Sequence, residues 1–380
     1  MLTVTAKTRS PSPFLHEPLP KSQNPNPKPS ISQQIHCFNG SYHKPTYQTE
    51  RGLQFETEDT FFRHESATGR DLGVLSAALY KQSKQQLRVL DVMCGCGIRS
   101  LRYLAEAKAD FVMANDGNDA HRRVILGNLK SIERGSGDEK RWVVTHFDAN
   151  RVLSECYLKR EFFDLIDIDS FGSDSSFLRT VFNAVKRDGL LYLTSTDGYS
   201  SGGHRPNKVM LRVHRKALPD NRHYGFISYC NHCGNSQAYS WEELGQMSCP
   251  CSNTIGSSSL VVSGPLWTGP LHDATHITKM LNLAEKWGWV GDGTGTDLEK
   301  LLSRMIDESD PRLPFGYIKL DEMASRAKMN SPSLKTMMSA VQKEGYVASR
   351  SHIASNAIKT NCPMVACIRI AKELQGCQKN

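Results

Sequence analysis

The heptapeptide Asp91-Val-Met-Cys-Gly-Cys-Gly97, which begins inside the short apolar run Leu87–Val92, decides the fold class. Glycines at positions 95 and 97 let the main chain pass close to a ligand at the carboxyl edge of a sheet. The third glycine of the dinucleotide-binding fingerprint is absent, because Ile98-Arg-Ser100 follows Gly97. An acid four residues before the first glycine suits a ligand that carries an amino-acid part. Asp91, Gly95 and Gly97 are therefore candidate cofactor-binding residues.

Strand and helix patterns alternate around this loop. Short apolar runs predict strands, and the longer stretches between them predict helices. The expected strands are 87–92, 111–114, 142–146, 163–168 and 189–195, and the expected helices are 100–107, 119–132 and 175–186. Short buried strands that alternate with helices indicate an α/β fold with a doubly wound, Rossmann-like parallel sheet.

Two further acids follow strands of this sheet. Asp116 ends the second strand, 19 residues after Gly97, where a carboxylate accepts hydrogen bonds from both ribose hydroxyls of a nucleoside. Asp148, followed by Ala149, ends the third strand, where an acid accepts from an adenine amino group. Each acid alone is most often a surface carboxylate. With Asp91 they line one crevice and predict a ligand-binding site.

Composition and charge narrow the classes of protein. The chain has 380 residues, enough for two or three domains, and no run of about 20 apolar residues predicts a transmembrane span. The net charge is +8, and it lies in the tail and the C-terminal half. Residues 1–50 carry 5 basic and 2 acidic side chains, and residues 204–380 carry 21 and 15. This field attracts a polyanion such as RNA, although a merely soluble surface has the same composition.

Residues 1–49 lack apolar periodicity and are rich in Pro, Ser, Asn and Lys, which predicts a basic tail without a core. An acidic-poor, Ser-rich N-terminus is typical of a transit peptide for a plastid or mitochondrion. The alternative is a disordered tail that contacts RNA in the nucleus or cytosol.

The chain beyond residue 203 differs in pattern, so we expect an α/β sheet domain at 50–203 and a mostly helical C-terminal domain at 204–380. Helices are expected at 298–306, 321–327 and 333–344, and the last two with 346–358 match a helix-turn-helix with a wing. Such helices often occur without nucleic-acid binding. The segment 204–222 is basic, and we expect phosphate contacts there, or else a solvated face, from Arg205, Lys208, Arg212, Arg215, Lys216 and Arg222.

Cysteine usage points to a reducing compartment and a metal. The chain has eleven cysteines, an odd number, and no secretory signal, which argues against a disulfide framework. Four cluster in two close pairs, Cys230 with Cys233 and Cys249 with Cys251, in the manner of a structural zinc ribbon. The second pair has one intervening residue instead of two, so His232 is a substitute ligand. Reduced structural cysteines are the alternative.

The end of the fourth strand, Asp167-Ile-Asp-Ser-Phe-Gly-Ser173, resembles the Asp-Pro-Phe-Gly motif of the tRNA (guanine-26-N2)-dimethyltransferase family. Gly69-Arg-Asp-Leu72 resembles the family's Asn-Arg-Asp-Leu, and Cys94–Arg99 resembles its Ser-Gly-Thr-Gly-Ile-Arg loop. Ser170 stands where the family has proline, and Gly69 where it has asparagine. The string Gly264–Asp273, and Ser349–His352 with Ile358–Thr360, are also similar to family motifs.

This resemblance implies a class I methyltransferase that uses S-adenosylmethionine to methylate the N2 amino group of guanine in tRNA, with no metal in the transfer. It implies that Arg70, Arg99, Asp116, Asp148 and Ala149 contact the cofactor. Asp169 becomes the catalytic candidate, because a carboxylate that accepts the amine N–H orients its lone pair and helps the proton leave. Phe171 is placed to stack on the flipped base. No obligate protein partner is evident.

One block of the family's sequence is missing. Asp197-Gly-Tyr199 leads almost directly to the basic stretch Val209–His214, so the last helix and strands of the sheet look deleted. We expect either His223–Tyr229 or Ser259–Ser263 as substitute strands. Methylation of another structured RNA, and a catalytically inactive RNA-binding protein, are therefore alternative functions.

Overall fold

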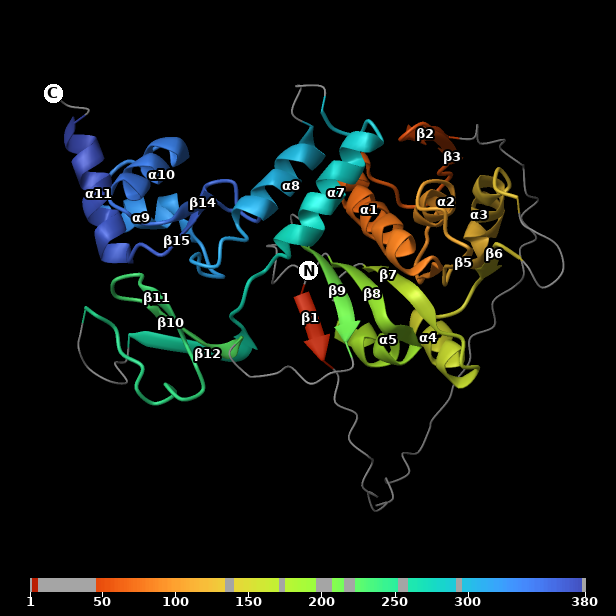
Figure 1. Ribbon diagram of the computed structural model, residues 1–380, viewed down its shortest axis with the longest axis horizontal. Coiled ribbons are helices and arrows are strands. Elements are labelled where there is room, and N and C mark those ends of the chain that lie inside the picture. Colours follow the sequence, from red (N-terminus) through yellow and green to blue (C-terminus); the bar gives the residue numbers. More distant parts are fainter. Residues whose placement is uncertain are drawn as a thin grey trace, which may run out of the picture.

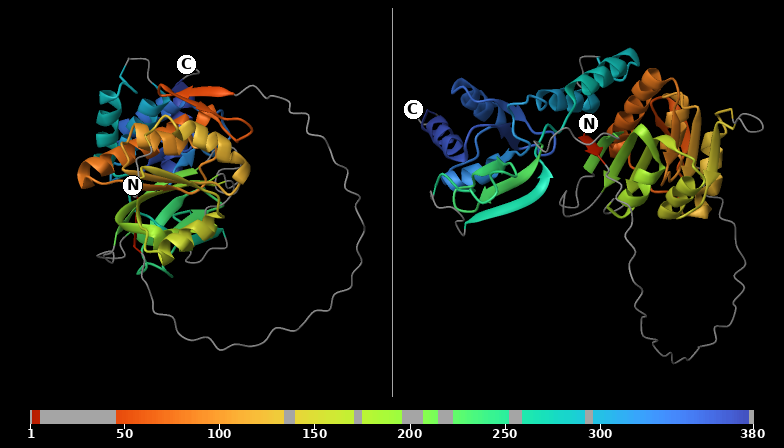
Figure 2. Two further views of the ribbon diagram at one scale, coloured as in Figure 1. Left: turned by 90° about the vertical axis from the view of Figure 1, so that its right-hand side faces the viewer. Right: turned by 60° about the horizontal axis from the view of Figure 1, so that its bottom comes forward.

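The computed structural model describes residues 2–5, 46–133, 140–170, 175–195, 207–214, 223–251, 259–291 and 296–377. Figure 1 shows a large sheet with its helices at one end, a C-terminal unit with a small sheet at the other, and α7 and α8 between them. A further view shows the same two parts side by side (Figure 2).

The large sheet confirms the α/β fold. Within the described residues it has seven strands, in the spatial order β1 (Leu2–Thr5), β9 (Asn207–His214), β8 (Val185–Ser195), β7 (Phe163–Ser170), β4 (Arg88–Asp91), β5 (Phe111–Asn115) and β6 (Trp142–Thr145). The run from β8 to β6 is parallel. β9 is antiparallel to β8, and β1 is parallel to β9. The sheet is therefore mixed, with the central strands arranged as predicted.

Helices cover both faces of this sheet, which is why its central strands are buried throughout. One face is covered by α1 (Ala67–Lys84), α2 (Ile98–Ala105) and α3 (Arg122–Leu129), with α7 (Ala274–Lys286) and α8 (Asp297–Asp307) packed beyond α1. The other face is covered by α4 (Ala149–Leu158) and α5 (Leu178–Ala184). A hairpin of β2 (Tyr47–Glu50) and β3 (Leu53–Glu56) precedes α1.

The edge of the sheet corrects three expectations. The predicted substitutes, His223–Tyr229 and Ser259–Ser263, do not join the large sheet; β9 and then β1 extend it instead. The expected boundary after residue 203 does not divide the chain there, because β9 lies beyond it and α7 and α8 share the core of α1. Strand β1 and the first three residues of β2 also lie within the segment 1–49, which was expected to lack folded structure.

A second, antiparallel sheet follows. It consists of β11 (Ser236–Tyr239), β10 (Tyr224–Cys230) and β12 (Leu260–Trp267), in that order. Arg326 connects this sheet to the C-terminal unit, donating from Nη2 to the Tyr229 hydroxyl at 2.7 Å and from Nη1 to the His232 carbonyl at 3.0 Å.

The C-terminal unit has its own apolar core. It contains α9 (Leu320–Ala327), α10 (Leu334–Lys343), α11 (Met364–Cys377) and a small sheet of β13 (Ile318–Lys319), β15 (Ala357–Thr360) and β14 (Ala348–Arg350). Two helices followed by a β-hairpin occur where the helix-turn-helix with a wing was predicted.

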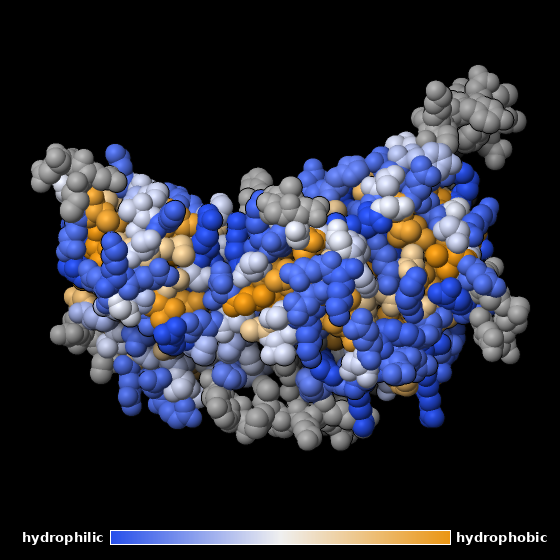
Figure 3. All heavy atoms as spheres, turned by 45° about the horizontal axis from the view of Figure 1, so that its top comes forward, coloured by the Kyte–Doolittle hydropathy of each residue, from blue (hydrophilic) through white to orange (hydrophobic). Residues whose placement is uncertain are grey.

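None of the described helices is both long and apolar enough to cross a membrane. On the face shown in Figure 3, hydrophilic side chains predominate and apolar side chains gather in several patches.

Candidate active site and cysteine cluster

The glycine loop between β4 and α2 lies at the carboxyl edge of the parallel strands. Gly95 has φ 55° and Gly97 φ 84°, a left-handed conformation that favours glycine. A Cβ on Gly95 would meet no atom within 4 Å, so the main chain borders open space there. A Cβ on Gly97 would reach Ile125 at 3.4 Å, which keeps α2 and α3 close. The loop can therefore approach a ligand with its bare main chain.

Asp116 holds the glycine loop from the end of β5. Its Oδ2 accepts the Gly95 N–H at 2.9 Å, and its Oδ1 accepts the Asn118 N–H at 2.9 Å. His121 Nδ1 lies 3.1 Å from the same Oδ1. A carboxylate has about four acceptor positions, so room remains for ribose hydroxyls. The structure thus places this predicted residue beside the loop, as the sequence suggested.

Asp148 and Ala149 lie at the start of α4. Asp148 is exposed and caps the helix, its Oδ1 accepting the Arg151 N–H at 3.1 Å, while Ala149 is buried. This capping role was not foreseen from the sequence. Because α4 begins at the carboxyl end of β6, the free main-chain N–H groups of its first turn lie at the same edge of the sheet as the glycine loop.

Arg99 joins the two acids of β7. Its Nη1 donates to Asp167 Oδ2 at 3.0 Å, and its Nη2 donates to Asp169 Oδ2 at 2.8 Å. The Tyr103 hydroxyl also donates to Asp167, at 2.6 Å. The Asp169 side chain is 37% exposed whereas that of Asp167 is fully buried. Asp169 is therefore the acid of this pair that a ligand can reach at the carboxyl edge of the sheet, and a buried arginine holds it in place.

Asp91 lies beneath the loop. Its Oδ2 accepts the Ser100 hydroxyl at 2.7 Å, and its Oδ1 is buried without a partner in the described structure. Burial, and then the neighbouring Asp167 carboxylate, raise the pKa of Asp91 well above its usual range. A buried carboxylate oxygen without a donor is unfavourable, so this position suits a ligand group that supplies an N–H.

Arg70 lies on the first turn of α1 and is already paired. Its Nε donates to Glu50 Oε1 at 2.9 Å and its Nη2 to Glu50 Oε2 at 2.5 Å, while Nη2 also donates to the Arg63 carbonyl at 3.0 Å. Its guanidinium lies 4.8 Å from the centre of the Phe62 ring. Both arginines expected to hold the cofactor carboxylate thus have protein carboxylates as partners.

The two described basic residues that were expected to contact phosphate lie at opposite ends of β9. Arg212 donates to Asp188 from Nε at 2.6 Å and from Nη2 at 2.8 Å, at the end of β9 far from the glycine loop. Lys208 lies at the other end of β9, against Gly69. Burial, and then the nearby charge of Arg99, lower the pKa of Lys208 to about 8. Arg205, Arg215, Lys216 and Arg222, and the catalytic candidate Phe171, lie outside the described residues.

Lys208 is the site residue that sequence reasoning misplaced. The basic pattern of residues 204–222 indicated a surface, and only the pairing of β9 with β8 shows that its first residues reach the edge occupied by Asp169. The order of strands in the sheet carries that information, and no local motif does.

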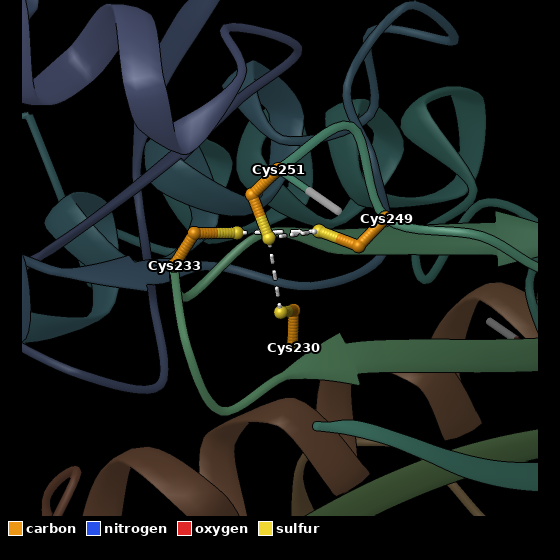
Figure 4. A group of neighbouring side chains, drawn as sticks. All are labelled: Cys230, Cys233, Cys249 and Cys251. Carbon is orange, nitrogen blue, oxygen red and sulfur yellow. Dashed lines mark hydrogen bonds between the residues drawn. The ribbon is translucent and has the colours of Figure 1, made fainter. Parts of the chain in front are cut away.

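The four predicted cysteines lie together (Figure 4). The distances between sulfur atoms are 3.7 Å for Cys230 and Cys251, 3.3 Å for Cys233 and Cys249, and 3.3 Å for Cys249 and Cys251. All four sulfur atoms lie within 4.8 Å of one another. His232 is exposed and is not part of this group. The short spacing of the second pair therefore does not prevent a four-sulfur cluster.

A second polar cluster lies where α8 meets the C-terminal unit. The fully buried Glu308 side chain accepts from His352 Nδ1 at 2.9 Å, forms an ion pair with Lys359 Nζ at 3.3 Å, and lies 3.5 Å from His272 Nε2. These three partners come from the family-like strings Gly264–Asp273, Ser349–His352 and Ile358–Thr360. In this structure they connect α8 to the C-terminal unit and to the segment before α7, which are far apart in sequence.

Comparisons with known proteins agree with this architecture. The chain is 26% identical over 355 residues to the tRNA (guanine(26)-N(2))-dimethyltransferase of Pyrococcus abyssi, covering 80% of this chain and 90% of that protein. It is 27% identical over 351 residues to the protein of the same name from Schizosaccharomyces pombe, covering 72% of this chain and 61% of that one. The structure of Trm1 from Pyrococcus horikoshii with S-adenosyl-L-methionine matches with a TM-score of 0.68 at 22% identity, covering 86% of this chain and 99% of that chain.

The family comparison covers most of the sequence. A family described as N2,N2-dimethylguanosine tRNA methyltransferase matches residues 44–223 and 208–372, and the two stretches overlap at 208–223, directly after the place where a block was expected to be missing. The resemblance drawn from the motifs is confirmed, and this chain belongs to the N2,N2-dimethylguanosine tRNA methyltransferase family.

Proposed function

We propose that this protein transfers one or two methyl groups from S-adenosylmethionine to the exocyclic N2 of a guanine in tRNA, at position 26 as the names of its relatives state. The observation that carries the proposal is the position of Asp169. Its carboxylate is partly exposed at the end of β7, is fixed by Arg99, and lies at the same edge of the sheet as the open glycine loop.

The residues around the loop fit the cofactor. Asp116 has acceptor positions left for ribose hydroxyls, the start of α4 lies where adenine is expected, and the partnerless Asp91 Oδ1 suits an amino-acid ammonium. When bound there, S-adenosylmethionine supplies the electrophilic methyl group. Arg70 and Arg99 hold the surrounding carboxylates in place.

Asp169 addresses the chemical difficulty of the reaction. The lone pair of the guanine amino group is delocalised into the ring, so the amine is a poor nucleophile. A carboxylate that accepts an amine N–H orients the lone pair and takes up the proton as the bond to carbon forms. Arg99 donates to Oδ2 alone, so within the described structure Oδ1 is the oxygen left for the amine. The arginine, buried itself, limits the rotation of the carboxylate.

The test is methylation of purified tRNA. The protein is incubated with S-adenosylmethionine and with tRNA transcripts that carry either guanine or adenine at position 26, and nucleosides are identified by mass spectrometry. We expect N2-methylguanosine, its dimethyl form, or both, only from the first transcript. Asp169→Asn should lower the single-turnover rate by about 10²-fold or more with little change in stability, because its ion pair is partly exposed.

Three outcomes would contradict the proposal. Equal methylation of both transcripts would mean that the target base is not at position 26. Methylation of another structured RNA alone would change the substrate. Binding of tRNA without any transfer would make the protein a catalytically inactive RNA-binding protein.

We also propose that Cys230, Cys233, Cys249 and Cys251 bind a structural Zn²⁺. Zinc–sulfur bonds of about 2.3 Å in a tetrahedron place sulfur atoms about 3.8 Å apart, and the distances of 3.3 and 3.7 Å approach that value. The ion would close the loop between β11 and β12 onto β10. Purified protein should contain about one equivalent of zinc, and Cys230→Ser should lower both metal content and thermal stability. Protein free of zinc without chelator treatment would refute the site.

Two further proposals concern how the C-terminal unit binds the substrate and where the N-terminal segment directs the protein in the cell. We propose that the C-terminal unit, with its helix pair and hairpin, docks the body of the tRNA, supported by the positive charge of residues 204–380. We propose further that residues 1–49 direct the protein to a plastid or mitochondrion. Imaging of a fluorescent fusion with and without those residues tests the second point, and an unchanged nuclear or cytosolic signal would refute it.

A further inference from the structure

Lys208 and Asp169 lie in one row across the sheet. Asp169 on β7 is paired with Thr194 on β8, and Thr194 is paired with Lys208 on β9. Cross-strand partners direct their side chains to the same face of a sheet. Lys208 therefore emerges on the face covered by α1, at the edge where the candidate catalytic carboxylate lies.

The end of the Lys208 side chain lies over Gly69. A Cβ added to Gly69 would lie 2.5 Å from Lys208 Cε and 2.6 Å from Nζ, so only the absence of a side chain leaves space for the ammonium group. The Gly69 carbonyl is fixed by the Tyr192 hydroxyl, which donates to it at 2.7 Å. Gly69 is also the position at which this chain departs from the Asn-Arg-Asp-Leu motif. The Lys208 side chain thus fills the space that a side chain at position 69 would occupy.

Lys208 is the basic group of this edge that forms no ion pair within the described residues, although the Asp169 and Asp71 carboxylates lie near enough to favour its charged form. Arg70 is paired with Glu50, and Arg99 with Asp167 and Asp169. Lys208 Nζ has neither a hydrogen bond nor an ion pair with any residue that the structure describes. Its pKa of about 8 fits an ammonium that has lost water and lies near the guanidinium groups of Arg99 and Arg70, whose effect on the pKa exceeds the opposite effect of the Asp169 carboxylate. Such a group gains most from an arriving anion.

The expected orientation of S-adenosylmethionine brings its carboxylate close to Lys208. Asp116 and the start of α4 lie at the ends of β5 and β6, where the nucleoside is expected. The rest of the molecule must extend across the glycine loop toward β7 and β8, because the strand order places β4 between these ends. The partnerless Asp91 Oδ1 suits the ammonium of its amino-acid part. Its carboxylate needs a cation on the side of β8 and β9.

We propose that Lys208 Nζ binds the carboxylate of the methionyl part of S-adenosylmethionine, in space left by Gly69. This inference rests on the proposed function for the identity of the ligand. It assigns the carboxylate to a lysine of β9, with Arg70 and Arg99 acting as anchors of the surrounding acids.

The test compares two ligands that differ in the amino-acid part. S-adenosylhomocysteine carries the carboxylate, and 5′-methylthioadenosine has the same nucleoside and thioether without it. In calorimetric titrations, Lys208→Met should weaken binding of S-adenosylhomocysteine about 10- to 100-fold, as expected for one charged hydrogen bond. Binding of 5′-methylthioadenosine should change less than about twofold. The control Lys279→Met, an exposed lysine on α7, should affect neither ligand.

A second variant separates this role from folding. Gly69→Ala keeps Lys208 but puts a methyl group where its Cε and Nζ lie, so the flexible side chain must move. Alanine in place of glycine favours a helix, so thermal stability should not fall. The same selective loss of S-adenosylhomocysteine affinity in this variant would support the carboxylate contact.

Several results would overturn the inference. An equal loss of affinity for both ligands in Lys208→Met would mean a general effect on the site. Unchanged ligand binding with weaker tRNA binding would make Lys208 a phosphate contact instead. If wild-type protein binds S-adenosylhomocysteine but methylates no tRNA, the proposed function fails while the lysine contact can still be measured.

Discussion

Replacing Glu308 with glutamine should strongly destabilise the protein, because a buried charge would lose its partner. The Glu308 side chain is fully buried and Lys359 is 2% exposed, with 3.3 Å between Nζ and Oε2. Glu308 also accepts the main-chain and ring N–H groups of His352. Removing one member of a buried ion pair typically costs about 3–5 kcal/mol. We expect the free energy of unfolding of Glu308→Gln to fall by about that amount.

The assay is urea unfolding followed by circular dichroism, with two comparisons. Glu344→Gln removes an equivalent charge from the exposed pair with Arg369 and should cost no more than about 1 kcal/mol. The double variant Glu308→Gln with Lys359→Met should be less destabilised than Glu308→Gln alone, since no buried charge is left unpaired. A loss below about 1 kcal/mol in Glu308→Gln would refute the reasoning.

The same group predicts a dependence on pH. Burial would raise the pKa of Glu308, but hydrogen bonds from His272 and His352 and the charge of Lys359 hold the pKa far below its usual value. A carboxyl with a lowered pKa in the folded state stabilises the fold above its unfolded pKa of about 4.5 and loses that contribution as the pH falls. The unfolding free energy of the wild type should therefore decline more steeply below about pH 5 than that of Glu308→Gln.

Two further predictions concern single side chains of the sheet. Asp116→Ala should weaken S-adenosylmethionine binding about 10-fold or more, because it removes the ribose acceptor and the support of the Gly95 N–H; calorimetry with unchanged affinity in a folded variant would contradict this placement. Arg212→Gln should leave the salt dependence of tRNA binding unchanged, because Asp188 already pairs with this arginine. A slope lower by about one unit would restore Arg212 as a phosphate contact.

The sequence predicted the parallel core of the fold well, because local patterns determine it. Runs such as 163–168 are apolar in nearly every position, as buried parallel strands require. The glycine loop and Asp116 followed from their positions at strand ends. Helices α1, α4, α7 and α11 were not predicted. Helix α1 is buried along most of its length, so its sequence lacks the polar stripe by which surface helices are recognised.

The partners of charged residues could not be predicted from the sequence. Arg99 and Arg70 were expected to be available for a ligand, but the structure pairs Arg70 with the buried Glu50, 20 residues away, and Arg99 with the buried Asp167, 68 residues away. Such pairing depends on which strands and helices become neighbours. For the same reason, the family-like strings that contain His272, His352 and Lys359 gave no hint of Glu308, which belongs to no recognised motif.

The short connection between β8 and β9 shows why the missing block does not prevent the sheet from extending. A parallel neighbour requires a long crossover, usually with a helix, whereas an antiparallel neighbour needs only a short return of the chain. β9 is antiparallel to β8, so the eleven residues 196–206 suffice to connect them. β1 then pairs with the outer side of β9 and continues the sheet. Because β9 starts at the edge where β8 ends, its first residues lie at the same edge of the sheet as Asp169, with β8 between them. The short connection therefore places Lys208 at the edge of the candidate site.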